Sequence, residues 1–153
     1  MPYQFTLYDA FSGMNLMEKS KVVRFLCSNT PNSSRQSAQE AVEYAMKLKP
    51  SFGGFVLAVE QGRELIGAIV ANRTGMESYN PKNIFVFVTL HEGHRQDKKL
   101  IQAMLQKAIR YADGDIAMHV EPDNPALGLY QELGFKAQYL ELRLANSNAS
   151  AVA

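Results

Sequence analysis

Two kinds of hydrophobic periodicity run along the chain and predict most of its strands and helices. In residues 3–8 the large apolar side chains fall on alternate positions, which is the period of a strand with one buried face. Residues 55–60 and 64–72 are rich in strand formers, and Gly62 between them allows the tight turn of a hairpin. Residues 84–90 are almost continuously apolar, which is typical of a strand covered on both faces.

Two polar pairs have the spacing of a capping box, in which a side-chain oxygen and a carboxylate satisfy the first amides of a helix. Asn15 with Glu18 predicts one helix, and Ser37 with Glu40 predicts a second. The two helices are predicted to end near Asn29 and around Pro50, respectively.

The second half of the chain contains the clearest amphipathic pattern. From residue 100 apolar pairs recur every fourth position, which predicts a helix with Asp97 as its cap. A short strand is predicted at residues 116–121 and a short helix at residues 125–133. In residues 139–144 leucines alternate with charged residues, which predicts a last strand.

This order of elements predicts an α/β fold of the α+β kind, in which helices cover both faces of a mixed sheet. The chain has 153 residues, of which 46% are hydrophobic, so we expect a single domain over residues 1–145 and a flexible tail over residues 146–153. A net charge of +1 argues against nucleic acid or an anionic membrane as a partner. The single cysteine, and the lack of a signal-like start or a long apolar stretch, indicate a cytoplasmic protein.

The segments HEGHRQDKKLIQAML and EPDNPALGLYQELGF, together with the element order, resemble the GNAT superfamily of small acetyltransferases. The resemblance extends from about Tyr3 to Leu144. It implies a mostly antiparallel central sheet of about six to seven strands, with acetyl-coenzyme A as cosubstrate and an amine as acceptor. Relatives of this kind are commonly homodimers, so a dimer is a further expectation.

The first segment matches the phosphate-binding turn of that family in a degenerate form. The family pattern is Gln/Arg-x-x-Gly-x-Gly/Ala, and small residues there allow backbone amides at a helix start to approach a pyrophosphate. Gln96 fits the first position, whereas Lys99 and Ile101 replace the two small residues. The resemblance assigns the pyrophosphate to Gln96, Asp97, Lys98, Lys99, Leu100 and Ile101.

The second segment matches the pattern Asn-x-x-Ala-x-x-Leu-Tyr followed by Gly-Phe. By spacing Asp123 occupies the asparagine position, and Asn124 would occupy it if one residue were missing. Both border the coenzyme in this interpretation, and Tyr130 stands where the family often has its proton donor. The matching positions are Ala126, Leu129, Tyr130, Gly134 and Phe135.

The group that polarises the acetyl carbonyl and the general base each have more than one candidate residue. In relatives an amide on the apolar strand polarises the acetyl carbonyl, which points to Phe87 or Val88. Four side chains are candidates for the general base, and no metal-ligand spacing is present. An alternative interpretation is a catalytically silent GNAT-like domain that binds a ligand or protein, because Lys99 and Ile101 are bulky. The four base candidates are His91, Glu92, His119 and Glu121.

Overall fold

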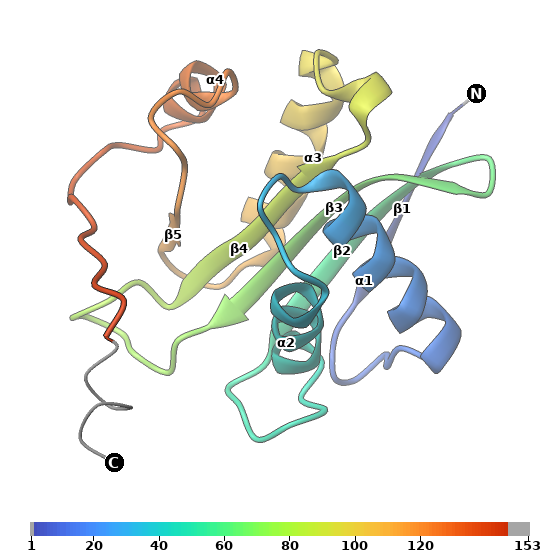
Figure 1. Ribbon diagram of the computed structural model, residues 1–153, viewed down its shortest axis with the longest axis horizontal. Helices are drawn as coiled ribbons and strands as arrows, with labels where there is room; N and C mark the ends of the chain where they lie inside the picture. The colour runs from blue at the N-terminus through green and yellow to red at the C-terminus, as the bar shows by residue number, and fades with distance from the viewer. Residues whose placement is uncertain (1, 147–153) are drawn as a thin grey trace. The chain divides into compact units, whose positions relative to one another are not determined.

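The computed structural model describes residues 2–146 of the chain. They fall into two compact units, Met1–Glu121 and Pro122–Ala153, which are described separately below. The first unit contains every strand and three α-helices, and the second contains the short helix α4 (Leu127–Glu132) (Figure 1). None of the helices within the described residues is both long and apolar enough to cross a membrane.

The first unit is built on a mixed sheet whose strands are neighbours in chain order. The first four strands pair antiparallel, and the fifth runs parallel to the fourth. Within the described residues the sheet has five strands rather than six to seven. They are β1 (Tyr3–Tyr8), β2 (Gly54–Gln61), β3 (Glu64–Arg73), β4 (Asn83–Leu90) and β5 (Ile116–Met118).

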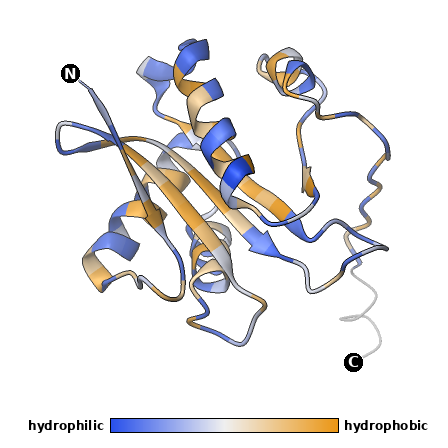
Figure 2. Cartoon of the chain, turned by 180° about the vertical axis from the view of Figure 1, so that it is seen from behind, coloured by the Kyte–Doolittle hydropathy of each residue, from blue (hydrophilic) through white to orange (hydrophobic). Residues whose placement is uncertain are grey.

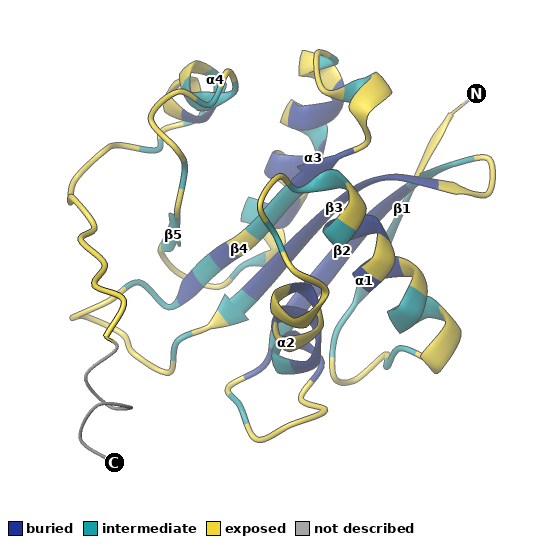
Figure 3. Cartoon of the chain, in the orientation of Figure 1, coloured by how far each residue is buried: buried dark blue, intermediate teal, exposed yellow. Residues whose placement is uncertain are grey.

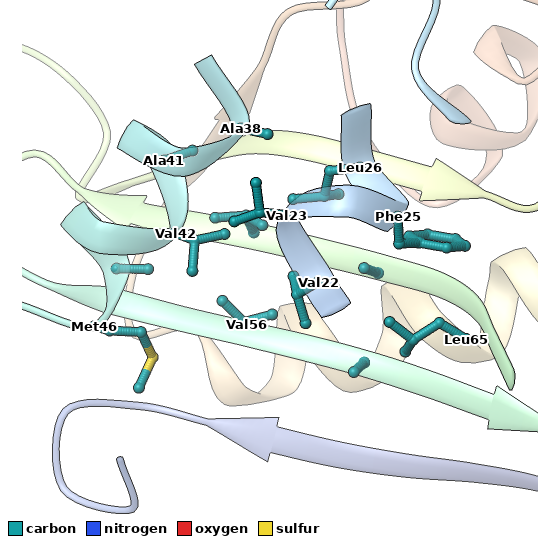
Figure 4. Close-up of a cluster of buried hydrophobic side chains, with 14 residues drawn as sticks. Val22, Val23, Phe25, Leu26, Ala38, Ala41, Val42, Met46, Val56 and Leu65 are labelled. Carbon is teal, nitrogen blue, oxygen red and sulfur yellow. The ribbon is translucent and has the colours of Figure 1, made fainter. Parts of the chain in front are cut away.

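Helices cover both faces of this sheet, as predicted. α1 (Leu16–Asn29) and α2 (Arg35–Ala45) lie on one face, and α3 (Lys98–Tyr111) lies on the other (Figure 1). The apolar strands consequently form the centre of the unit, and the helices turn their polar sides outward (Figure 2). The first layer buries a cluster drawn from both helices and two central strands, in which Val23 and Leu26 of α1 meet Val42 of α2 (Figure 4).

The second layer is held by the apolar stripe of α3. Leu100, Met104 and Leu105 are almost completely buried. A side chain at Gly67 of β3 would come within 2.8 Å of the Met104 side chain, so this glycine lets α3 lie close to the sheet. Because successive residues of a strand point to opposite faces, the central strands are buried on both sides.

Local sequence signals account for the ends of several elements. The capping box of Asn15 and Glu18 is present at the start of α1, which ends at Asn29 as predicted. Gly62 adopts a φ of 67° in the turn between β2 and β3, which confirms the predicted hairpin. These elements were predictable because their decisive contacts lie within a few residues of each other.

The predicted start of the second helix is wrong by one turn. Ser34, in an extended conformation, caps α2 by accepting a hydrogen bond from the amide of Ser37 at 3.0 Å. Ser37 therefore lies inside the first turn and is not the cap. The helix also ends at Ala45, well before Pro50, and Lys47 reverses the chain with a φ of 56°.

Three other predictions about strands are corrected by the structure. β4 is not covered on both faces throughout, because Val86 is 37% exposed. The fifth strand ends at Met118 instead of residue 121, and residues 139–144 are not part of any strand. Of the predicted tail, residues 147–153 lie outside the described residues.

Candidate functional site

β4 pairs with its neighbour β5 over only the first part of its length. The parallel pairing between the two strands involves only Asn83–Phe85 of β4, whereas β4 continues to Leu90. A register shift in the ladder with β3 leaves Val86 without a partner, and a bulge of this kind bends a strand. Within the described residues one edge of β4 around Phe87 and Val88 therefore has no neighbouring strand.

The chain turns tightly after β4 and then begins α3. A single turn of 3₁₀ helix, η1 (Glu92–His94), follows the strand, and the amide of Asp97 donates to the carbonyl oxygen of His94 at 3.1 Å. Asp97 is the N-cap of α3, as predicted. A helix start in this position presents unsatisfied amides and the positive end of the helix dipole, which together favour an anion.

The carboxylate of Asp97 already occupies part of this helix start. One of its oxygens accepts a hydrogen bond from the amide of Leu100 at 3.1 Å, and the other accepts from the hydroxyl of Tyr3 at 2.8 Å. The bond from Tyr3, followed by the bond from Leu100, lowers the pKa of Asp97, so it stays ionised. The amide of Lys99 also contributes to this shift, and the amide of Ile101 donates to the Asp97 carbonyl oxygen. Of the four amides at residues 98–101, that of Lys98 is the one without a hydrogen-bond acceptor within residues 2–146, so it is open to a ligand.

The side chains at the start of α3 point in two directions. Lys98 and Lys99 are exposed, and so is Gln96. Leu100 and Ile101 are buried, with 1% and 4% of their surface exposed. The bulky Ile101 side chain therefore packs into the core of the unit, and only its backbone belongs to the helix start. Lys98 and Lys99 therefore place two exposed, positively charged side chains in the first turn of α3.

Tyr3 and His94 both interact with Asp97, in an arrangement that the sequence analysis missed. The rings of Tyr3 and His94 meet edge to face with centroids 6.5 Å apart, and those of His91 and His94 are 5.9 Å apart. Nε2 of His94 lies 3.3 Å from the amide oxygen of Gln61. Its Nδ1 is buried and has no hydrogen-bond partner within residues 2–146. Pairing of β1 with β2 brings Tyr3 opposite Gln61, and this long-range register left no local signal.

The Asp97 cap has a measurable effect on stability. Asp97→Ala removes the acceptor for the Leu100 amide, so we expect a loss of about 1 kcal/mol in the free energy of unfolding at neutral pH. Because the folded pKa is lowered, this contribution is present above the ordinary pKa of about 3.9 and is lost as pH falls through the folded pKa. The difference between variant and native protein in urea unfolding should therefore shrink in acid.

Asp97→Asn is the matched control for that measurement, since asparagine is an equally good cap but carries no charge. We expect it to keep most of the stability at neutral pH and to lack the acid dependence. An equal loss in both variants would mean that the cap hydrogen bond is not the cause.

The four candidates for the general base follow two strands, with His91 and Glu92 directly after β4 and His119 and Glu121 beyond the end of β5. His91 accepts a hydrogen bond at Nδ1 from the amide of Gly93 at 3.1 Å. A neutral imidazole that accepts at Nδ1 carries its proton on Nε2, so His91 offers no basic nitrogen while this bond is made. Glu92 is exposed. His119 and Glu121 follow the end of β5 and are both exposed, so the strand face that they were predicted to share is not formed.

The second unit contains the Asn-Pro-Ala turn and Tyr130. The side-chain oxygen of Asn124, and not that of Asp123, accepts a hydrogen bond from the amide of Ala126 at 2.8 Å. α4 is shorter than predicted, and the chain leaves it through Gly134 with a φ of 108°. Tyr130 is 5% exposed, and its burial raises the pKa of the hydroxyl above the usual 10.0. Its hydroxyl is therefore protonated at neutral pH.

Comparison with known proteins places this arrangement in a family. The family model described as the acetyltransferase (GNAT) family matches residues 20–135, which is most of the chain. The chain belongs to the GNAT acetyltransferase family. No curated protein matches it.

Several solved structures share the fold of this chain. A GNAT family acetyltransferase from Streptococcus pneumoniae is 12% identical with a TM-score of 0.67, and the match covers 95% of this chain and 99% of the other. An aminoglycoside acetyltransferase from an uncultured soil sample, solved with sisomicin, is 12% identical with a TM-score of 0.61 over 95% of both chains. A transcriptional regulator from Bacillus halodurans is 17% identical with a TM-score of 0.63 over 94% of this chain and all of the other. At these identities the likeness concerns the fold alone.

The GNAT family implies acetyl-coenzyme A as cosubstrate, and the start of α3 fits its diphosphate in part. The exposed lysines and the Lys98 amide suit an anion, whereas the Asp97 carboxylate competes for the neighbouring amides. Within residues 2–146, no group of three or more His, Cys, Asp or Glu side chains could hold a metal ion.

Proposed function

We propose that this GNAT protein is an N-acetyltransferase that passes the acetyl group of acetyl-coenzyme A directly to a primary amine of a small molecule or protein. The observation that carries the proposal is the junction of β4 with α3. In the part of the chain that the structure describes, one edge of β4 beyond Phe85 has no neighbouring strand, and the helix that follows starts with two exposed lysines. A free amide at the strand edge can polarise the acetyl carbonyl, and the positively charged helix start can bind a diphosphate.

The diphosphate would be held at the front of α3. Lys98 supplies an amide, and the ammonium groups of Lys98 and Lys99 supply positive charge where glycines would otherwise allow closer approach. Gln96 would add an amide hydrogen-bond donor from the preceding turn. The Asp97 carboxylate must share the Leu100 amide or leave it, because two anions at one helix start repel each other. We therefore expect weaker coenzyme binding than a turn with two glycines would give.

The acetyl carbonyl would be polarised by a backbone amide of β4. Phe87 and Val88 are both half-buried and lie beyond the last residue that pairs with β5. An amide that is not used in a ladder is available to the oxygen that becomes negative in the tetrahedral intermediate. Such a donor is fixed in place before the reaction, so it requires no reorganisation when charge develops.

Tyr130 would donate the proton to the leaving thiolate. In the reaction the amine nitrogen bonds to the acetyl carbon, the bond from that carbon to sulfur breaks, and the sulfur takes a proton. The raised pKa of Tyr130 keeps its hydroxyl protonated at neutral pH, which a general acid requires. A base or a chain of water molecules takes the proton that the amine loses. Glu92, His119 and Glu121 remain candidates for this base. His91 is a poorer candidate, because its Nδ1 already accepts a hydrogen bond from the amide of Gly93.

A second candidate function is a GNAT domain without catalysis that binds a ligand or protein. The Asp97 carboxylate on the amides of α3 favours it, because the protein itself then fills part of the anion site. The two candidates differ in one property that can be measured: the catalytic protein must bind acetyl-coenzyme A.

Thermal unfolding with and without acetyl-coenzyme A separates the two. A ligand at a hundred times its dissociation constant stabilises the folded state by about 2.7 kcal/mol, which raises the melting temperature by about 5–10 °C for a chain of this size. We expect such a rise for the native protein with millimolar acetyl-coenzyme A. If the melting temperature does not move, the catalytic proposal fails and the silent domain is favoured.

Charge reversal locates the bound diphosphate. With Lys98→Glu and Lys99→Glu combined, we expect acetyl-coenzyme A to bind roughly tenfold more weakly or worse, because charge-assisted contacts are lost. Arg110→Glu reverses a charge in the last turn of the same helix and serves as the control. Equal weakening in both proteins would indicate a general charge effect and not a site at the start of α3.

A further inference from the structure

Two hydrogen bonds connect the end of α1 to the part of the chain that leads from β4 into α3. Nη2 of Arg95 donates to the carbonyl oxygen of Asn29 at 2.9 Å. The hydroxyl oxygens of Thr30 and Thr89 lie 2.9 Å apart, and either group can be the donor. The partners are 66 positions apart in the first bond and 59 in the second. Both bonds therefore depend on the fold, and the acetyl-transfer proposal does not use them.

The end of α1 is a suitable place for a guanidinium group. The last carbonyl groups of a helix have no partner within the helix, and the helix dipole gives them a partial negative charge. Residues 26–29, which form the last turn of α1, include no basic residue. Arg95 supplies a positive charge there from a distant part of the chain. The bond to Asn29 is charge-assisted, which makes it stronger than a bond between two neutral groups.

The end of α1 is itself attached to the sheet. Thr89 lies in β4, and only 4% of its surface is exposed. A buried hydroxyl group needs a hydrogen-bond partner, and Thr30 provides one. Residues 30–34, which connect α1 to α2, are exposed or half-buried, so packing does little to hold them (Figure 3). The bond between the two threonines therefore gives Arg95 a fixed point to bind.

Arg95 belongs to the segment that leads to the proposed diphosphate site. Residues 92–97 are exposed or half-buried, so their conformation depends largely on hydrogen bonds (Figure 3). The amide of His91, directly before them, donates to the carbonyl oxygen of Ile66 in β3 at 2.8 Å. Arg95 attaches the same segment to α1. The next element begins with the amide of Lys98, which the proposed function assigns to the diphosphate.

We propose that Arg95 is a positioning residue for coenzyme binding, and that it acts by holding the turn before α3 against the end of α1. The inference rests on the proposed function, because it concerns the same diphosphate site. A backbone amide binds an anion best when it is fixed in the required place before the ligand arrives. Without the bond from Arg95 the turn would be freer, and the cost of ordering it would oppose binding.

Isothermal titration calorimetry of Arg95→Ala with acetyl-coenzyme A tests the inference. We expect the dissociation constant to rise roughly fivefold, which is the cost of ordering about one side chain. The rate of thiol release at saturating coenzyme should not change, because the bond is the same in the ground state and the transition state. In the protein without coenzyme, amide hydrogen exchange at residues 92–98 should be faster in Arg95→Ala than in the native protein. Arg95 is exposed, so the variant should fold like the native protein.

Arg24→Ala is the matched control. It removes the same charge from another exposed arginine, which lies in α1 with its Nη2 3.5 Å from the hydroxyl oxygen of Ser20. This variant should change neither the dissociation constant nor the hydrogen exchange of residues 92–98. Equal changes in both variants would mean that the loss of charge, and not the bond to Asn29, is the cause, and would overturn the inference.

Salt separates positioning from a direct attraction between Arg95 and the diphosphate. We expect the ratio of the dissociation constants of Arg95→Ala and the native protein to stay the same between about 0.05 and 0.5 M sodium chloride. An ionic attraction is screened over this range, so a ratio that falls toward one overturns the inference. Equal affinity of the two proteins overturns it as well, even if hydrogen exchange is faster, and leaves the proposed function intact. If the native protein does not bind acetyl-coenzyme A, the proposed function fails and the inference fails with it.

Discussion

Tyr130→Phe should release thiol from acetyl-coenzyme A about 100-fold more slowly than the native protein, because general acids typically contribute that much or more. The change removes one hydroxyl and keeps the ring, which is buried and meets Phe135 at a centroid distance of 6.4 Å. Coenzyme binding should be unaffected, so the loss should appear in kcat and not in KM for acetyl-coenzyme A. The measurement is thiol release in the presence of a panel of primary amines.

Tyr139→Phe provides the control for that experiment. It makes the same chemical change in the same unit at a side chain that is 94% exposed, and it should leave the rate unchanged. Melting temperatures of both variants show whether a loss of rate is a loss of folded protein. Full activity in Tyr130→Phe, with an intact fold, would exclude this hydroxyl as the proton donor.

Gly54→Ala should lower the free energy of unfolding by about 3 kcal/mol or more, at the upper end of what overpacking costs. Gly54 pairs with Asn72 where β2 and β3 begin their ladder. A Cβ at this position would lie 1.9 Å from the carbonyl oxygen of Ala71 and 2.8 Å from its carbonyl carbon. Both atoms belong to the backbone of β3, so they cannot turn aside as a side chain could. The strands would have to separate at this point, and urea unfolding measures the cost.

Gly128→Ala is the comparison for Gly54→Ala. Gly128 lies in α4, and a Cβ there would meet nothing within 4 Å. Alanine is the better helix former by up to about 1 kcal/mol, so we expect no loss of stability. If Gly54→Ala changes stability by less than about 0.5 kcal/mol, as ordinary surface substitutions do, the close approach of β2 and β3 is wrong.

The sequence predicted those parts of the fold that depend on neighbouring residues. The capping box of Asn15 and Glu18, the hairpin at Gly62 and the cap at Asp97 all involve contacts within three residues. The start of α2 shows the limit of that reasoning. Serine is a good cap at either position, and in the structure it is Ser34 that has the extended backbone and accepts from the Ser37 amide.

Contacts between distant residues could not be predicted in the same way. The hydroxyl of Tyr3 reaches Asp97 across 94 positions of the chain, because the β1–β2 pairing and the packing of α3 both have to be known first. The alternation in residues 139–144 predicted a strand that the structure does not contain, because alternation describes two faces but does not supply an edge to pair with. The family resemblance assigned Lys99 and Ile101 to a phosphate-binding turn, which stays a prediction. The burial of Ile101 could not be predicted with it, because that burial follows from the position of α3 on the sheet.

The proposed acetyl transfer requires acetyl-coenzyme A to bind where β4 leads into α3. Titration of ¹⁵N-labelled protein with acetyl-coenzyme A, followed through backbone amide chemical shifts, tests this position directly. We expect the largest changes at Gln96–Ile101, with a second group at Val86–Leu90 along the free edge of β4. If the amide chemical shifts of both segments stay unchanged at saturating acetyl-coenzyme A, the proposed binding position is wrong.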